Sequence, residues 1–136
     1  MILVDTNVLI DVVTENTAWA EWSATQLARA IDKHGIAINP VIYSEFSIPY
    51  LHERDVDQAL TALSAARLEM PWPAAFLAGK AFALYRSRGG NRTAPLPDFF
   101  IGAHAAVAGL TLLTRDAARY REYFPKVKLI APETGQ

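Results

Sequence analysis

The chain begins with Met1-Ile-Leu-Val-Asp-Thr-Asn-Val-Leu-Ile-Asp11, and the interpretation of the whole sequence starts from this stretch. Ile2–Val4 is a short apolar, partly β-branched run, which is typical of a strand buried on both faces of a parallel sheet. Asp5 follows this run directly. A carboxylate at the carboxyl end of such a strand lies at the edge where parallel α/β sheets bind ligands. Because aspartate is also a favoured N-cap, the stretch alone leaves both capping and chemistry open for Asp5.

Length and composition predict one compact domain over residues 1–136. A chain of this length buries roughly two-thirds of its extended surface, and a hydrophobic share of 51% supplies a core. It contains no cysteine, which excludes disulfides, thiolate chemistry and cysteine-type zinc sites and is compatible with the cytoplasm, where we expect the protein. The N-terminus enters a strand at once, and no apolar run approaches the ~20 residues that span a bilayer. We therefore expect neither a secretory signal nor a membrane partner.

Charge is divided unevenly along the chain. Residues 1–66 carry three basic and nine acidic side chains, a net charge of −6, whereas residues 67–136 carry ten basic and five acidic ones, a net charge of +5. Such a division can place a polyanion-binding flank beside a carboxylate site, although two solvated faces would give the same totals. The basic, turn-rich loop Ser87–Thr93, which follows Arg86 and contains Arg88 and Arg92, is the best candidate for phosphate binding.

Apolar runs and helical patterns alternate along the chain. The predicted strands are Ile2–Val4, Ile36–Ile38, Leu68–Met70, Leu110–Leu113 and Val127–Ile130. The predicted helices are Val8–Val13, Ala18–His34, Val41–Tyr50, Gln58–Ala66, Ala74–Arg86, Phe99–Ala108, and a short helix after Asp116. The helix Ala18–His34 is expected to have its N-cap at Asn16-Thr17, its C-cap at Gly35, and a buried stripe of Trp19, Trp22, Leu27 and Ile31. A charged connector, His52–Asp57, precedes Gln58–Ala66. This alternation predicts an α/β fold with a mostly parallel central sheet and helices on both faces.

Four acidic residues are predicted to meet at one edge of that sheet. Asp5 and Asp116 come at or just after the ends of apolar strands, and Glu45 and Asp98 lie early in helices that follow loops. Helices of such a fold begin where the strands end, so the four carboxylates can converge there. Four carboxylates in one cleft repel each other unless a cation holds them together. Oxygen ligands without histidine or cysteine suit Mg²⁺ or Mn²⁺ rather than zinc.

A divalent ion in a carboxylate cluster is suited to phosphodiester hydrolysis. It can orient a water molecule, lower the pKa of that water, and stabilise charge on the attacking and leaving oxygens. A remaining carboxylate can accept the proton of the water, and a basic flank can hold the backbone of a nucleic acid.

The residues around these acids resemble the ordered motifs of PIN-domain nucleases. The matching stretches are Asp5-Thr-Asn-Val-Leu-Ile-Asp11, Glu45 in an apolar helix, Leu96-Pro97-Asp98-Phe-Phe-Ile-Gly102 and Leu113-Thr-Arg-Asp116. The compact length is similar to that of VapC toxins of toxin–antitoxin pairs. The resemblance runs through most of the chain and implies a three-layer α/β/α sandwich with Mg²⁺- or Mn²⁺-dependent endoribonuclease activity.

Carried over by position, the resemblance implies roles for individual residues. Asp5, Glu45, Asp98 and Asp116 match the acidic, metal-binding and catalytic site. Thr114 matches the hydroxyl residue before the last acid, Asn7 the polar position that ties down Asp5, and Thr6 a supporting position. The candidate contacts to RNA are Arg86, Arg88, Arg92 and Arg115. The resemblance also implies a homodimer, a structured RNA substrate, and a cognate VapB-type antitoxin whose C-terminal segment would block the acidic cleft.

Several other assignments remain open at this stage. The alternative role for Asp116 is to cap the helix that follows it, Asp11 is assigned a surface or supporting role, and His104 is assigned to the core or rim. A haloacid-dehalogenase-type phosphatase would need a second aspartate where Asn7 stands. A receiver-like signalling domain would need paired acids early in the chain. A catalytically inactive PIN module that binds RNA or a protein is the main alternative.

Overall fold

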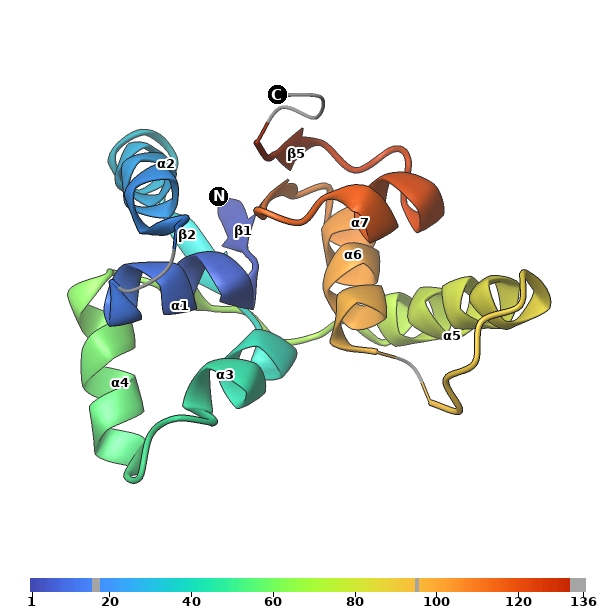
Figure 1. Ribbon diagram of the computed structural model, residues 1–136, viewed down its shortest axis with the longest axis horizontal. Helices are drawn as coiled ribbons and strands as arrows, with labels where there is room; N and C mark the ends of the chain where they lie inside the picture. Colours follow the sequence, from blue (N-terminus) through green and yellow to red (C-terminus); the bar gives the residue numbers. More distant parts are fainter. Residues whose placement is uncertain (16–17, 95, 133–136) are drawn as a thin grey trace.

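The computed structural model describes residues 1–15, 18–94 and 96–132, which form one parallel sheet between two sets of helices (Figure 1). In chain order the elements are β1 (Ile2–Val4), α1 (Thr6–Thr14), α2 (Ala20–Lys33), β2 (Ile36–Ile38), α3 (Pro40–Ser47), α4 (Glu53–Ala62), β3 (Ala66–Arg67), α5 (Trp72–Ser87), α6 (Pro97–Ala108), β4 (Thr111–Leu113), α7 (Ala118–Tyr123) and β5 (Leu129–Ile130). The strand order is β3-β2-β1-β4-β5, and each neighbouring pair is parallel. The predicted α/β/α sandwich is confirmed.

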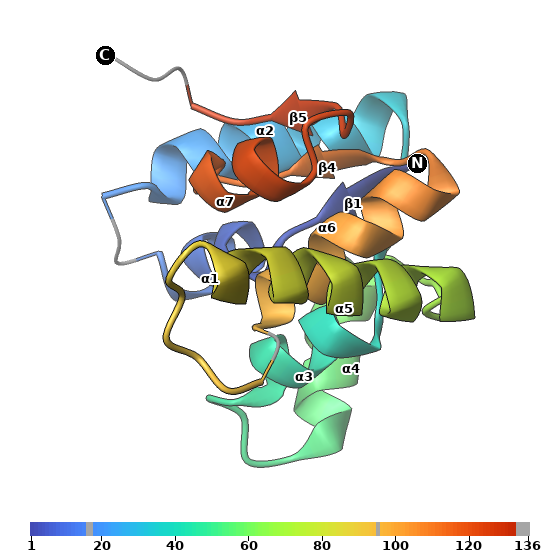
Figure 2. The ribbon, with the colours of Figure 1, turned by 90° about the vertical axis from the view of Figure 1, so that its right-hand side faces the viewer.

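The helices divide between the two faces of the sheet. In Figure 1, α1, α2 and α4 lie on one side of the strands and α5, α6 and α7 on the other. Figure 2 shows α5 running across the outer surface of α6, with which it packs closely. Helix α3 contacts both α1 and α6, so it joins the two helical layers. None of the helices in the described part of the chain is long and apolar enough to cross a bilayer.

The central strands are buried because apolar side chains cover both of their faces. Every residue of β1 and β2 is buried, and the largest buried side chains include Leu3, Phe46 and Phe99. In the register of β1 with β4, Val4 lies opposite Leu113. The backbone N–H of Asp5 then donates to the carbonyl oxygen of Leu113 (2.8 Å), which continues the ladder by one residue and places Asp5 beside the residue after β4.

Most predicted boundaries differ from the structure by a few residues, and three of these differences have a clear physical cause. Helix α1 begins at Thr6, two residues earlier than predicted, because Asp5 caps it. The charged connector 52–57 is not a loop: α4 begins at Glu53 and ends at Ala62, with two acidic side chains in its first turn, where the helix dipole favours them. Strand β3 is formed by Ala66–Arg67 instead of Leu68–Met70, since the earlier end of α4 brings the chain back to the sheet sooner.

The predicted buried stripe of α2 is only partly confirmed. Leu27 is buried, Trp22 and Ile31 are half-buried, and Trp19 is exposed (38%) because it precedes the first turn and packs edge-on against Trp22. The predicted N-cap at Asn16-Thr17 lies outside the described residues. At the other end, Gly35 has φ +75° and its N–H donates to the carbonyl of Ala30, which confirms it as the left-handed residue that stops the helix.

Candidate active site

Asp5 both caps α1 and lies at the centre of a polar cluster at the carboxyl edge of the sheet. Its Oδ1 accepts a hydrogen bond from the backbone N–H of Thr6 (2.8 Å). Its Oδ2 accepts from the hydroxyls of Thr114 and Tyr120 (both 2.9 Å) and from Nδ2 of Asn7 (3.4 Å). The capping role of Asp5 is therefore confirmed through Oδ1, whereas its chemical role stays a prediction.

The environment of Asp5 favours its neutral form. The residue is 5% exposed, and burial raises its pKa to about 6 from an ordinary 3.8. The bonds from Tyr120 and Thr114 pull the pKa down, whereas the charge of Asp98 pushes it further up. The carboxylate of Asp5 is therefore held by hydroxyl, amide and backbone donors, and within the described residues no lysine or arginine forms an ion pair with it.

Glu45 is joined to Asp5 through Thr6. The hydroxyl of Thr6 donates to Oε1 of Glu45 (2.7 Å), and α3 presents Glu45 at this position because Asn39 caps the helix through the N–H of Ile42 (2.9 Å). The amide Nδ2 of Asn39 in turn lies 3.0 Å from Nδ1 of His104, which is buried; the assignment of His104 to the core or rim is therefore confirmed as core. Burial raises the pKa of Glu45, with a further contribution from Asp98.

Asp98 lies in the first turn of α6 and faces the other acids across the edge of the sheet. Burial raises its pKa; the guanidinium of Arg119, 3.8 Å from Oδ2, opposes this shift, and the charge of Asp116 adds to it. Because Asp98 also raises the pKa of both Asp5 and Glu45, it is the acid through which the cluster is electrostatically coupled.

Asp116 is the most exposed of the four acids. It is held by its backbone: its N–H donates to Oγ1 of Thr114 (3.1 Å), and the same hydroxyl lies 3.3 Å from the carbonyl oxygen of Asp116. Thr114 therefore links the segment that carries Asp116 to Oδ2 of Asp5. Asn7 adds a second link, since its Oδ1 accepts from the backbone N–H of Arg115 (3.3 Å) and its Nδ2 lies 3.4 Å from Oγ1 of Thr114.

Two residues of this edge were not predicted from the sequence. Tyr120 is 1% exposed and donates to Asp5, and burial beside the acids raises its pKa well above the ordinary 10, so its hydroxyl remains a donor. Arg119 lies beside Asp98, with its guanidinium carbon 5.4 Å from the ring centres of Tyr85 and Phe99. In the sequence, Tyr120 has only the pattern of a core aromatic residue, and Arg119 that of a surface cation.

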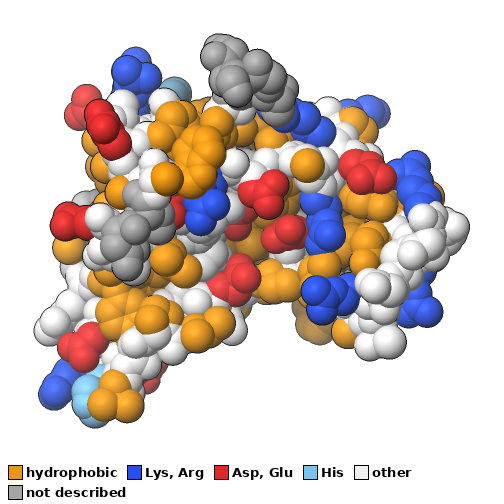
Figure 3. Space-filling model, viewed as in Figure 1, with side chains coloured by type: hydrophobic (Ala, Val, Ile, Leu, Met, Phe, Trp, Pro, Cys, Tyr) orange, Lys and Arg blue, Asp and Glu red, His pale blue; other side chains and the backbone are white. Residues whose placement is uncertain are grey.

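Figure 3 shows acidic side chains gathered over α3, α6 and α7, with Lys and Arg side chains beside them toward α5. The chemistry of the donors suits a hard divalent ion, because the set consists of carboxylate oxygens. In the arrangement described for residues 1–15, 18–94 and 96–132, however, no three acidic or histidine side chains are close enough to share an ion. An ion shared by three of these groups would therefore require them to lie closer together.

The predicted RNA-contacting arginines have different surroundings. Nη1 of Arg86 donates to the carbonyl of Arg92 (2.8 Å), and Arg88 pairs with Glu122 (3.2 Å). Arg92 is exposed. Arg115 is directed to α1, where Nε donates to Oδ2 of Asp11 (2.7 Å). Asp11 is fully buried and also accepts from Ser23, so its predicted surface position is wrong and a supporting role remains.

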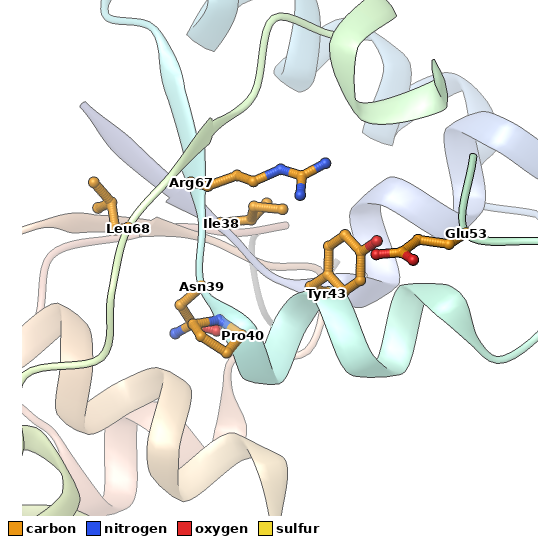
Figure 4. Close-up of a pocket in the computed structure, with 7 residues that line it drawn as sticks. All are labelled: Ile38, Asn39, Pro40, Tyr43, Glu53, Arg67 and Leu68. Carbon is orange, nitrogen blue, oxygen red and sulfur yellow. The ribbon is translucent and has the colours of Figure 1, made fainter. Parts of the chain in front are cut away.

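The residues that line a cavity of about 290 Å³ (Figure 4) include none of the four acids. It is lined by residues at the ends of β2 and β3 and the start of α3, including Asn39, Tyr43 and Arg67. The guanidinium of Arg67 lies 5.0 Å from the ring centre of Tyr43, and both side chains bond Asp57 (2.6 and 2.8 Å). These polar groups therefore satisfy one another.

The fold and the acidic edge agree with the comparison to known families. The family profile described as PIN domain matches residues 2–124. The chain belongs to the PIN-domain family, whose members are generally nucleases and typically use divalent metals. Among curated proteins, none matches the sequence significantly.

Solved structures of toxin–antitoxin complexes contain chains of similar fold. A chain of VapBC2 from Rickettsia felis, bound to a DNA fragment from their promoter, has a TM-score of 0.73 at 16% identity and covers 98% of this chain and 100% of that one. A chain of FitAcB from Neisseria gonorrhoeae has a TM-score of 0.67 at 20% identity, with 96% of each chain covered. A chain of DNA-bound VapBC from Salmonella typhimurium has a TM-score of 0.66 at 18% identity and covers 96% of this chain and 98% of that one. At these identities the likeness concerns the fold.

Proposed function

We propose that this protein is a metal-dependent endoribonuclease and the toxin of a VapBC-type toxin–antitoxin pair. One observation carries the proposal: Thr6 joins the carboxylates of Asp5 and Glu45 through hydrogen bonds of 2.8 and 2.7 Å, and Asp98 lies near enough to raise the pKa of both. Such a cluster is costly without a cation, and a structural role would not require it. Asp116 lies near enough to Asp98 to raise its pKa.

We assign the proposed ion to Asp5, Glu45, Asp98 and Asp116. A bound Mg²⁺ or Mn²⁺ would act as a Lewis acid. It would activate a water molecule and stabilise the negative charge that develops on the phosphate in the transition state. Thr6, Thr114 and Tyr120 hold Asp5 in one orientation, and Thr6 also holds Glu45. A carboxylate of the set with a raised pKa is suited to accept a proton from the attacking water.

The RNA backbone is proposed to lie across the basic residues beside the acids. Arg86, Arg88 and Arg92 belong to the predicted phosphate-binding loop, Arg115 is the remaining predicted contact, and Arg119 stands at the rim of the acidic cluster. Guanidinium groups suit this role because they hold phosphate oxygens with paired donors. Structured RNA is the proposed substrate class.

A homodimer and an antitoxin that blocks the acidic cleft complete the proposal. The similar folds occur in solved complexes of VapBC and FitAB proteins, which supports a partner of the same kind for this chain. A short reading frame for such a partner immediately upstream would agree with the proposal. The co-purified partner should abolish cleavage by the full chain.

The alternative is an inactive PIN module that binds RNA or a protein partner. Among the described residues, no three acidic side chains are close enough together to bind one ion, and this favours the alternative. A cleavage assay separates the two functions, because the inactive module binds RNA in Mn²⁺ without producing new ends.

The decisive experiment is cleavage of total cellular RNA by the purified protein with Mg²⁺, Mn²⁺ or EDTA, followed by mapping of the ends. We expect cleavage with either metal and none with EDTA. Asp5→Asn should abolish cleavage, and the matched control Asp32→Asn, which changes an exposed residue of α2, should retain it. Cleavage in EDTA, or full activity of Asp5→Asn, would refute the proposal.

A further inference from the structure

Asp11 and Arg115 form an ion pair between α1 and the segment that follows β4. Nε of Arg115 lies 2.7 Å from Oδ2 of Asp11; the side chain of Asp11 is 0% exposed and that of Arg115 is 31% exposed. The same oxygen accepts a hydrogen bond from the hydroxyl of Ser23 on α2 (2.7 Å). A buried carboxylate keeps its charge only where partners compensate it, so this pair is a built part of the fold.

The segment Thr114–Asp116 is attached to α1 at a second point. The backbone N–H of Arg115 donates to Oδ1 of Asn7 (3.3 Å), and Asn7 precedes Asp11 by four residues on the same helix. One attachment uses the backbone of Arg115 and the other its side chain. The segment is therefore held along one face of α1, because positions four apart on a helix lie on the same side.

This segment carries two groups of the acidic cluster. The Thr114 hydroxyl donates to Asp5 and accepts from the N–H of Asp116, so a shift of the segment would displace both the donor to Asp5 and the fourth acid. We propose that Asp11 and Arg115 are positioning residues whose ion pair holds Thr114 and Asp116 in place at the acidic cluster. The effect on catalysis rests on the proposed nuclease function.

This role competes with the predicted contact of Arg115 to RNA, and the two make different predictions. An RNA contact acts through affinity. Its loss weakens RNA binding and reduces the slope of log affinity against log salt concentration by about one. A positioning residue acts through geometry, because small displacements in an active site lower the rate of the chemical step. Asp11 separates the roles, since a fully buried carboxylate does not contact a polyanion.

The test compares Asp11→Asn, Arg115→Met and the double variant on one structured RNA with Mn²⁺. Arg115→Met leaves the buried charge of Asp11 without its ion-pair partner and so risks misfolding. Asp11→Asn keeps the shape of the side chain, removes that charge and breaks the same ion pair, so it tests the proposal even if Arg115→Met does not fold. We expect about a tenfold lower kcat in each single variant, with an unchanged KM. For RNA binding in EDTA, the slope of log affinity against log salt concentration should stay at the wild-type value. The double variant should have the same kcat as the single variants, because the effects of substitutions at two residues that act together are not additive.

A second ion pair in the fold provides the matched control. Asp57 accepts from Arg67 (2.6 Å) and from the hydroxyl of Tyr43 (2.8 Å), which reproduces the arrangement around Asp11, but at a partly exposed position away from the segment after β4. Asp57→Asn and Arg67→Met should leave kcat unchanged. A tenfold fall in these variants as well would show that loss of any such pair slows the enzyme and would overturn the positioning role.

Amide hydrogen exchange provides a readout that does not depend on cleavage. In Asp11→Asn, the amides of Arg115 and Asp116 should exchange about tenfold faster, whereas the amide of Thr114, bonded to the carbonyl of Ile130 (3.0 Å), should remain protected. Unchanged exchange at all three amides would overturn the proposal, as would an Arg115→Met variant that loses RNA affinity while Asp11→Asn keeps wild-type kcat. If the wild-type protein cleaves no RNA, the nuclease function falls, and exchange alone decides the positioning role.

Discussion

The hydroxyl of Thr6 donates a 2.7 Å hydrogen bond to Oε1 of Glu45, which lies 39 residues further along the chain. The backbone N–H of the same threonine donates to Oδ1 of Asp5 (2.8 Å). A single residue at the start of α1 therefore orients two carboxylates from two elements. Its side chain is buried, so this bridge is part of the packed fold rather than a surface contact.

Thr6→Val should slow cleavage with little change in the fold. Valine has nearly the same shape but lacks the hydroxyl, so Glu45 loses a hydrogen bond to its charged form, which is typically worth about 1.5–3 kcal/mol. The pKa of Glu45 should rise further, because this bond lowers it. We expect roughly a tenfold lower kcat, if about half of that energy acts in the transition state. The control is Thr14→Val, which removes a hydroxyl at the exposed end of the same helix; equal activity of the two variants would contradict the prediction.

The stability of the metal-free protein should fall as Asp5 ionises. Because the folded pKa of Asp5 is about 6 and the ordinary value 3.8, its contribution is fully present below about pH 4 and is lost as the pH rises through 6. The loss amounts to about 3 kcal/mol at 1.36 kcal/mol per unit. Asp5→Asn does not titrate, so its stability relative to wild type should grow by this amount between pH 4 and pH 7 in urea titrations with EDTA. A difference that stays constant with pH would show that Asp5 is not destabilised by burial.

Tyr120→Phe should destabilise the fold at neutral pH and impair the site. The variant removes a buried donor to Oδ2 of Asp5, which costs about 1–3 kcal/mol, and the pKa of Asp5 should rise because this bond lowers it. Urea unfolding at pH 7.5 measures the loss, and a Mn²⁺ titration of cleavage measures the effect on the site. Tyr123→Phe removes a hydroxyl from the same helix, and a similar loss there would argue against a specific role of Tyr120.

Arg119→Met should weaken RNA binding more than it affects the fold. We expect the slope of log affinity against log salt to fall by about one unit, as for the loss of one phosphate contact. Because Arg119 lowers the pKa of Asp98, that pKa should also rise. Binding in EDTA at several salt concentrations provides the measurement. Arg121→Met, at an exposed position of the same helix, is the control, and an equal effect of both variants would indicate a diffuse rather than a local contact.

The strands and the order of the elements follow from local sequence patterns. Ile2–Val4 and Ile36–Ile38 are short apolar runs followed by a polar residue, and the structure confirms both. Boundaries that depend on contacts with other elements were less predictable. The segment 52–57 is charged or polar except at Val56, yet α4 begins within it, because the helix buries Val56 and Leu60 while its acidic side chains occupy the first turn.

In the candidate site, too, positions follow from local sequence patterns, whereas contacts depend on distant parts of the chain. Positions after strands and within the helices that follow them, together with the family resemblance, predicted Asp5, Glu45, Asp98 and Asp116 as site residues, since in a parallel sheet such positions share one edge. Their roles stay a prediction. The hydrogen-bond partner of a side chain could not be predicted in this way. Arg115 has the sequence context of a surface cation beside an acid, but its guanidinium lies on buried Asp11, 104 residues earlier in the chain.

The sequence by itself determined the parallel α/β fold and the acidic residues at its edge, because periodicity and strand–helix order are local properties of the chain. Only the tertiary structure decided which groups hold those acids: Thr6 on Glu45, Tyr120 on Asp5, and Arg115 on Asp11. The physical reason is that hydrogen bonds and burial depend on side chains brought together by packing from distant parts of the sequence. The raised pKa of Asp5 has the same origin, since burial is its largest cause.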